Sequence, residues 1–189
     1  FPPSPDNPRL PQPTQAALPP NLLQQYQQHW NNPEERARLI DLVAIHALES
    51  DDKQSAVRTF GDMLRVETTP DLKVALLDEL ASLETAAALE PILRHLQAGE
   101  PEDVREAATA AAEATLTSFA FAETKPSLEQ LSPLLDARYP ASVREAAIAA
   151  LQDLDDKRAI PHLQRLLQDP DETVRAAAEA GIEWLQQQE

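Results

Sequence analysis

The sequence predicts an all-α fold: a solenoid of about five two-helix repeats behind an extended proline-rich arm. A proline-led turn, Val-Arg and a stripe of small residues recur three times, at 101–111, 140–151 and 170–181. The chain has only 3 Gly and 4% aromatic residues, and its apolar content is mainly Ala and Leu, which favour helices over strands. The 42% hydrophobic content over 189 residues is enough for one continuous core.

Residues 1–20 contain eight prolines, too many for a helix or a strand ladder, and predict an extended arm or linker. A spacer is favoured over a ligand for a proline-binding module, because the PxxP spacing of Pro2 and Pro5 is common by chance. The chain begins at Phe1 rather than Met, so we expect an exported or periplasmic domain rather than a cytoplasmic one. No apolar run reaches the about 18 to 20 residues that direct membrane insertion needs.

Residues 21–32 predict a short amphipathic helix, in which Leu22, Leu23, Tyr26 and Trp30 recur at helical spacing. Terminal repeats of a solenoid expose an apolar face unless another element covers it. We therefore expect this helix to cap a solenoid formed by residues 33–189.

From Pro33 onward, two kinds of helix alternate. The second helix of each pair opens on a proline, and these helices are expected at 33–49, 70–83, 101–117, 140–154 and 170–187. The first helices are expected at 52–66, 86–97, 126–137 and 156–168. Alignment of the second helices uses Ala37, Leu72, Val104, Val143 and Val174 as position zero. Positions +3, +4, +7, +8 and +11 then form a core stripe, and +2, +5, +6 and +9 face outward.

These motifs resemble the HEAT-repeat family, in the form that bacterial phycobilin lyases share. The segment 155–185 carries both halves of the family pattern, DDKRAIPHLQRLL followed by a D-P turn and VRAAAEAG, and a weaker likeness extends over 33–189. The resemblance implies a ladder between neighbouring repeats, formed by a turn acid and by the cation that follows the valine, six residues after the acid. The cations, expected to be structural, are Arg38, Lys73, Arg105, Arg144 and Arg175. The corresponding turn positions are Asn32, Glu67, Gly99, Arg138 and Asp169, so the acid is present only at Glu67 and Asp169.

No motif for catalysis, metal or cofactor binding is present. The histidines His29, His46, His95 and His162 are widely separated, and Gly is too scarce for a phosphate-binding loop. The absence of Cys excludes thiolate zinc sites and cysteine nucleophiles. A net charge of −16 without a basic stripe disfavours nucleic acid as a partner.

The outward positions of the second helices are the candidate partner-binding site, on the concave face that the resemblance implies. In the later copies they include Glu106, Glu113, Glu145, Ile148, Gln152, Glu179 and Glu183. In the earlier copies they are apolar: Leu39, Leu42, Val43, Val74 and Leu77. An apolar groove beside an acidic band would suit a protein partner with a basic amphipathic segment, unless residues 21–32 cover the groove. The acidity also fits a simply solvated surface, which is the plainer interpretation.

These observations favour a non-enzymatic interaction or scaffold module. The resemblance to phycobilin lyases implies one alternative, a lyase or chaperone acting on a bound tetrapyrrole. A structural spacer belonging to a larger exported protein is another.

Overall fold

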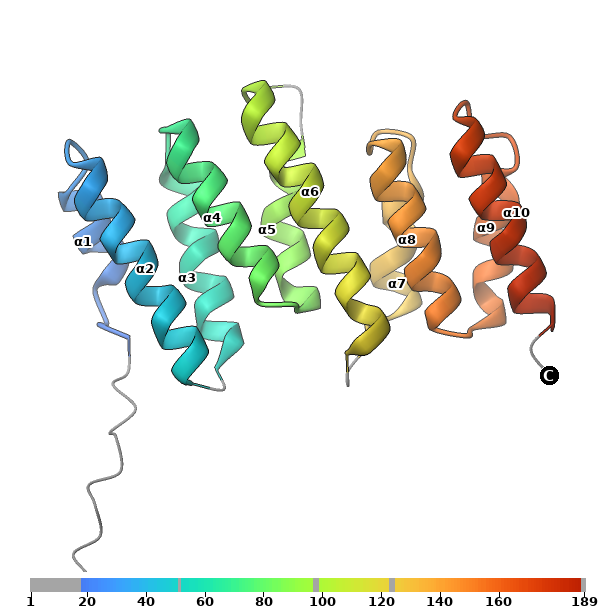
Figure 1. The fold of residues 1–189 in the computed structure, drawn as a ribbon, viewed down its shortest axis with the longest axis horizontal. Coiled ribbons are helices and arrows are strands. Elements are labelled where there is room, and N and C mark those ends of the chain that lie inside the picture. Colours follow the sequence, from blue (N-terminus) through green and yellow to red (C-terminus); the bar gives the residue numbers. More distant parts are fainter. Residues whose placement is uncertain (1–17, 51, 97–98, 123–124, 188–189) are drawn as a thin grey trace, which may run out of the picture.

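The computed structural model describes residues 18–50, 52–96, 99–122 and 125–187, so residues 1–17 of the arm predicted at 1–20 lie outside them. The described segments are helical and contain no strand. Helices pair along the chain, and the pairs stack side by side in two layers (Figure 1). The fold is therefore the all-α solenoid that the repeated sequence motif predicts.

One layer holds the second helix of every pair, and these helices run in the same direction (Figure 1). We call it the second layer; it contains α2 (Pro33–Glu49), α4 (Pro70–Ser82), α6 (Glu102–Ser118), α8 (Ala141–Asp153) and α10 (Glu172–Gln187). The first layer lies behind it and contains the first helices, α1 (Leu22–Gln28), α3 (Lys53–Val66), α5 (Leu89–Leu93), α7 (Leu128–Leu131) and α9 (Ile160–Leu166).

Several first-layer α-helices are short because prolines interrupt them. Adjoining 3-10 turns extend the helical segments. Flanking α5 are η1 (Ala86–Ala88) and η2 (Arg94–Leu96); η3 (Phe119–Phe121) follows α6, η4 (Ser132–Leu135) follows α7, and η5 (Lys157–Ala159) precedes α9. Pro161 lies in the first turn of α9 rather than at mid-helix, where its missing N–H costs no hydrogen bond.

Local chemistry sets where the second helices begin. Pro33 and Pro70 occupy the first turns of α2 and α4, where their fixed φ suits the helix. The Asn32 side chain accepts a hydrogen bond from the Glu35 amide at 3.2 Å and so caps α2. The turns after α4 and α8 reverse at Glu84 (φ 50°) and Asp155 (φ 54°), left-handed positions where helices commonly end.

The core lies between the two layers and changes character along the array. Its early part is filled by large side chains of α3, including Phe60, Met63 and Leu64. Its later part relies on small residues that let backbones approach, such as Ala147 of α8 and Ala178 of α10. The same architecture is therefore packed in two different ways.

The helix predicted at 21–32 spans Leu22–Gln28 and occupies the first-layer place beside α2, so that α1 and α2 form a pair like the others (Figure 1). Leu22 and Tyr26 are buried, whereas Trp30 lies beyond the end of α1 and is 39% exposed. None of the helices in the described part of the chain is both long and apolar enough to cross a membrane.

Candidate functional site

The outward surface of the second layer, which we call the second-helix face, carries most of the predicted partner-binding residues. Glu106, Glu179, Glu183 and Leu42 are exposed. Half-buried members of the set are Leu39, Val74, Glu113, Glu145 and Gln152. These nine positions are accessible, as the prediction required.

Three predicted face residues, Val43, Leu77 and Ile148, are buried, and their assignment to a binding surface is wrong. On α4 and α8, which have neighbouring second helices on both sides, position +5 is covered as well as the core stripe. The methyl group of Ile148 lies 3.3 Å from where a Cβ on Gly181 of α10 would be. Leu77 occupies the same position on α4, which lies between α2 and α6 (Figure 1).

Val43 is buried because it lies on the core side of α2. The predicted register of this helix, with Ala37 as position zero, is one residue late. The buried positions of α2 are Arg36, Ile40 and Val43, which match the 0, +4 and +7 pattern of α10 only if Arg36 is position zero. The corrected register moves Ile45 from the core stripe to an outward position. Ile45 is 52% exposed, and Leu42 beside it is 40% exposed.

An exposed apolar patch therefore lies on α2, made of Leu42, Ile45 and Leu48. Leu48, at the end of the helix, is 87% exposed. Sequence reasoning missed Ile45 and Leu48 because it counted them in the core stripe. The signal that could have found them was Arg36 itself, a cation one residue before the aligned alanine.

The rest of the second-helix face is acidic and has no compensating cation. Downstream of the Val-Arg position, no Lys or Arg occurs in 74–82, 106–118, 145–153 or 176–187. The acids of these segments are Asp78, Glu79, Glu106, Glu113, Glu145, Asp153, Glu179 and Glu183. Burial, followed by the neighbouring Asp41 and Asp78 carboxylates, raises the pKa of Glu79. Like charges are thus crowded where α2 and α4 meet.

Three cations of the second helices, Arg36, Lys73 and Arg144, instead make contacts between neighbouring repeats, which we call rungs. The Arg36 rung is the most extensive: its Nη1 donates to both carboxylate oxygens of Glu67, at 2.5 and 2.6 Å. Glu67 also accepts hydrogen bonds from the Tyr26 hydroxyl and from the amides of Thr68 and Thr69. The Arg36 guanidinium lies 5.0 Å from the centre of the Trp30 ring. Tyr26, Arg36 and Glu67 are all buried.

This environment moves the pKa values of the Glu67 carboxyl and the Tyr26 hydroxyl in opposite directions. Burial alone would raise the pKa of Glu67, but hydrogen bonds from Tyr26, from the Thr69 and Thr68 amides and from Arg36 hold it below its usual value. Burial, followed by the Glu67 carboxylate, raises the pKa of the Tyr26 hydroxyl. The rung therefore holds a carboxylate beside a neutral phenol over a wide pH range.

In the next rung, Lys73 of α4 donates to Glu100 at 2.6 Å, and His95 Nδ1 lies 2.9 Å from the other oxygen of that carboxylate. Burial lowers the pKa of His95, and the nearby cations Lys73 and Arg94 act in the same direction against Glu100. The last rung joins Arg144 of α8 to Asp169 at 2.8 Å. Both side chains are buried there.

The geometry corrects the predicted ladder in detail. Each acid pairs with a cation of the preceding repeat, so Glu67 meets Arg36 rather than Lys73, and Asp169 meets Arg144. Arg38 is exposed and contacts only Glu35 of its own helix among the ion pairs found, so its structural role passes to Arg36. Arg175 donates to the carbonyls of Asp169 and Pro170 within the last repeat. Arg105 has no ion-pair partner within the described segments.

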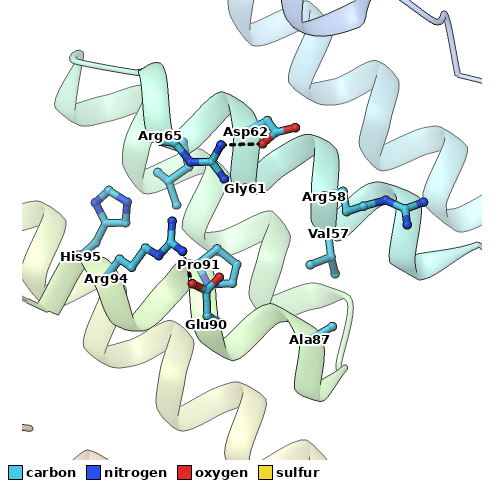
Figure 2. Close-up of a pocket in the computed structure, with 11 residues that line it drawn as sticks. Val57, Arg58, Gly61, Asp62, Arg65, Ala87, Glu90, Pro91, Arg94 and His95 are labelled. Atoms are coloured by element: carbon cyan, nitrogen blue, oxygen red, sulfur yellow. Dashed lines mark ion pairs between the residues drawn. The ribbon is translucent and has the colours of Figure 1, made fainter.

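Two cavities open between first-layer helices, on either side of α5. Figure 2 shows the smaller one, of about 540 Å³, where Gly61 of α3 faces Pro91 of α5. Four of its charged side chains form two ion pairs, Arg65 with Asp62 and Arg94 with Glu90 (Figure 2), and Arg58 donates to the Ser55 hydroxyl. The larger, of about 700 Å³, lies between α5 and η4 and includes Arg105 and Arg138.

Neither cavity has the features of a catalytic centre or a tetrapyrrole site. Tyr139 is the one Phe, Tyr or Trp side chain in the larger cavity, and the ring of His95 is the one aromatic group in the smaller. Among the described residues, no cluster of His, Asp or Glu could hold a metal ion. The tetrapyrrole alternative gains no support from these two cavities.

Comparison with known proteins identifies the repeat. Residues 114–183 match the family described as HEAT repeats. No curated protein shows detectable similarity to the chain. The match covers the later repeats, whereas the helix pairs of the structure begin at α1.

Proposed function

Because residues 114–183 match HEAT repeats, which generally mediate protein–protein interaction, we propose that the chain is a non-enzymatic interaction module. The partner binds the second-helix face. Its chemistry is that of a basic amphipathic segment, with cations opposite the acids of α4 to α10 and apolar side chains toward the α2 patch.

One observation carries this proposal: the second-helix face has acids in every helix from α4 to α10 and no cation downstream of the rungs. A face that only needs to be solvated usually mixes both signs of charge. Here the first layer does so, with surface pairs such as Arg65–Asp62 and Arg94–Glu90. Burial, followed by repulsion from Asp41 and Asp78, raises the pKa of Glu79, and a bound cation would relieve the repulsion.

The α2 patch supports a partner that is amphipathic rather than merely basic. Leu42, Ile45 and Leu48 are exposed on the helix that ends the second layer, where no further helix of the described chain covers them. Exposed apolar groups beside a charged surface are typical of protein-binding sites. A helical segment with Leu on one face and Lys on the other matches both parts.

The proposal can be tested with a labelled peptide of about 18 residues, Lys on one helical face and Leu on the other, followed by fluorescence anisotropy at about 0.15 M salt. The double variant Glu145→Lys with Glu179→Lys should weaken binding about tenfold or more, because two acids become repulsive. Leu42→Ser with Ile45→Ser should also weaken it, with little loss of stability, since both side chains are already exposed.

The matched control reverses two exposed first-layer acids, Glu90→Lys with Glu129→Lys, which changes the net charge by the same amount. Binding to this control should stay within about twofold of the parent protein. If the Glu90→Lys, Glu129→Lys control weakens binding as much as Glu145→Lys with Glu179→Lys, the peptide senses only net charge and the second-helix face is not a binding site. Export of the module stays a separate proposal, to be checked by cell fractionation.

A further inference from the structure

One rung of the array lacks its acid. Between the third and fourth pairs, Arg105 of α6 stands where Lys73 and Arg144 stand in their helices, but the turn position that would face it is Arg138. Both arginines line the cavity of about 700 Å³ between α5 and η4. A cation therefore opposes a cation at the place where the other rungs hold an ion pair.

The three complete rungs show what this place is built to hold. Each contains one carboxylate, from Glu67, Glu100 or Asp169, bound by the cation of the preceding repeat. Backbone amides assist: those of Thr68 and Thr69 donate to Glu67, and that of Asp171 donates to Asp169 at 2.9 Å. A carboxylate is thus the group that the repeat geometry accepts at this level.

The remaining walls of the cavity are mostly apolar. Leu89 and Leu93 of α5, Leu134 of η4 and Tyr139 line it. The Arg138 guanidinium stacks over the Tyr139 ring at 4.9 Å, which holds the cation in place at the cavity. Arg94 also lines the cavity but is paired with Glu90, and Arg138 Nε lies 4.0 Å from the Asp136 carboxylate. Arg105 has no ion-pair partner among the described residues.

We propose that this cavity, the Arg105 site, binds a carboxylate carried on an apolar group, which enters from outside and completes the vacant rung. The carboxylate lies between Arg105 and Arg138, and its apolar body lies against the leucines. The volume is within the range of about 300 to 1,000 Å³ typical of small-ligand sites. A free fatty-acid-like molecule and the C-terminal carboxylate of a peptide share this chemistry.

The Arg105 site is independent of the second-helix face. Its lining comes from first-layer elements together with Arg105, and it shares none of the residues Glu145, Glu179, Leu42 or Ile45. The proposed function can therefore fail while this inference stands, and the reverse also holds.

The test measures octanoate and its uncharged analogue octanamide by isothermal titration calorimetry and by ¹H–¹⁵N NMR on the full chain. Octanoate should bind with a Kd of about 1 mM, a reasonable value for a ligand of this size. Octanamide should bind at least about tenfold more weakly, because it cannot form charge-assisted hydrogen bonds. The amide signals that shift should include those of Leu93, Arg105 and Tyr139.

Two variants and a control locate the binding. Arg105→Gln should weaken octanoate binding about tenfold, and this residue is exposed, so the fold should be kept. Arg138→Asp should abolish binding and raise the melting temperature, because it supplies the missing acid to Arg105. The control Arg58→Gln removes an exposed cation of α3 and should leave the Kd unchanged.

A tripeptide ending in leucine, with a free or an amidated C-terminus, distinguishes the two sources of carboxylate. Tighter binding of the free peptide than of octanoate assigns the site to a chain terminus, and the opposite order assigns it to a free acid. Equal binding of octanoate and octanamide would overturn the proposal. So would unchanged octanoate binding in both Arg105→Gln and Arg138→Asp.

Discussion

The two ends of the array make the same inter-repeat contact with different residues. At the C-terminal end, one buried pair, Arg144 with Asp169, joins the last two repeats. At the N-terminal end, Glu67 is bound by Arg36, by the Tyr26 hydroxyl and by two backbone amides. The cation there stands at position zero of its helix, whereas Arg144 follows position zero.

This difference shows that the fold requires a cation at this point in space, whichever position of the second helix supplies it. A buried acid at the turn needs a cation from the preceding repeat, and either of two positions on the second helix can supply it. It also accounts for the span of the family match, which covers 114–183 although helix pairs begin at Leu22. The early repeats keep the inter-repeat contact but not the sequence motif of the family.

The comparison predicts that the N-terminal rung is the more costly to break. Glu67→Gln keeps the shape of the side chain but leaves Arg36 buried without its counter-charge. We expect the free energy of unfolding to fall by about 3 to 5 kcal/mol, the usual cost of breaking a buried ion pair. Chemical denaturation followed by circular dichroism measures it, and a loss below about 1 kcal/mol would mean that the cluster is not a stabilising unit.

Asp169→Asn should cost less, about 2 to 3 kcal/mol, because Asp169 is bound by Arg144 and one backbone amide, whereas Glu67 is bound by a cation, a hydroxyl and two amides. The same denaturation measurement applies. A control at an exposed acid, Glu183→Gln, should change stability by no more than about 0.5 kcal/mol. An Asp169→Asn loss larger than that of Glu67→Gln would reverse the order of the two rungs.

Packing can be compared through one glycine in each half. A Cβ on Gly61 would lie 3.5 Å from Pro91, an ordinary contact, so Gly61→Ala should stabilise the protein by about 0.5 to 1 kcal/mol through helix propensity. A Cβ on Gly181 would lie 3.0 Å from Leu163 and 3.3 Å from Ile148. Gly181→Ala should therefore destabilise by about 1 kcal/mol. Thermal unfolding of the two variants checks the opposite signs; equal shifts would show that the late core is no tighter.

The smallest expected effect concerns pH. Because the pKa of His95 is lowered in the folded protein, the unfolded chain binds its proton first as the pH falls. The contribution of His95 is present above its ordinary pKa of about 6.5 and is lost as the pH falls through the lower, folded value. His95→Gln should remove this part of the slope between about pH 7 and 5. The fall below about pH 4.5 that Glu67 causes should remain in that variant, since the pKa of Glu67 is also lowered. An unchanged slope would exclude His95 as its source.

Residue pattern alone predicted the fold because the proline-led starts and the 3.6-residue stripe are local properties. The helix at Ala141–Asp153, for example, lies within the predicted 140–154. The acids of the second-helix face were also predictable, since charged residues at outward positions stay exposed.

What could not be predicted depends on neighbours. Ile148 is buried by α10, and Leu77 occupies the equivalent place on α4, a consequence of stacking that no single helix pattern contains. The rung partners Arg36 and Glu67 lie 31 residues apart and required the actual register of α2 against the following turn. The periodicity predicted the helical repeat fold, but it did not predict which side chains pair between repeats.

The vacant rung at Arg105 also bears on how the molecule comes apart. In a stack where each repeat contacts only its neighbours, stability is shared among the interfaces, and the weakest interface limits cooperativity. We expect the free protein to behave as two unfolding blocks, α1 to α6 and α7 to α10, rather than as one. A ligand bound at the Arg105 site would then couple these two blocks, so that they unfold as one cooperative unit.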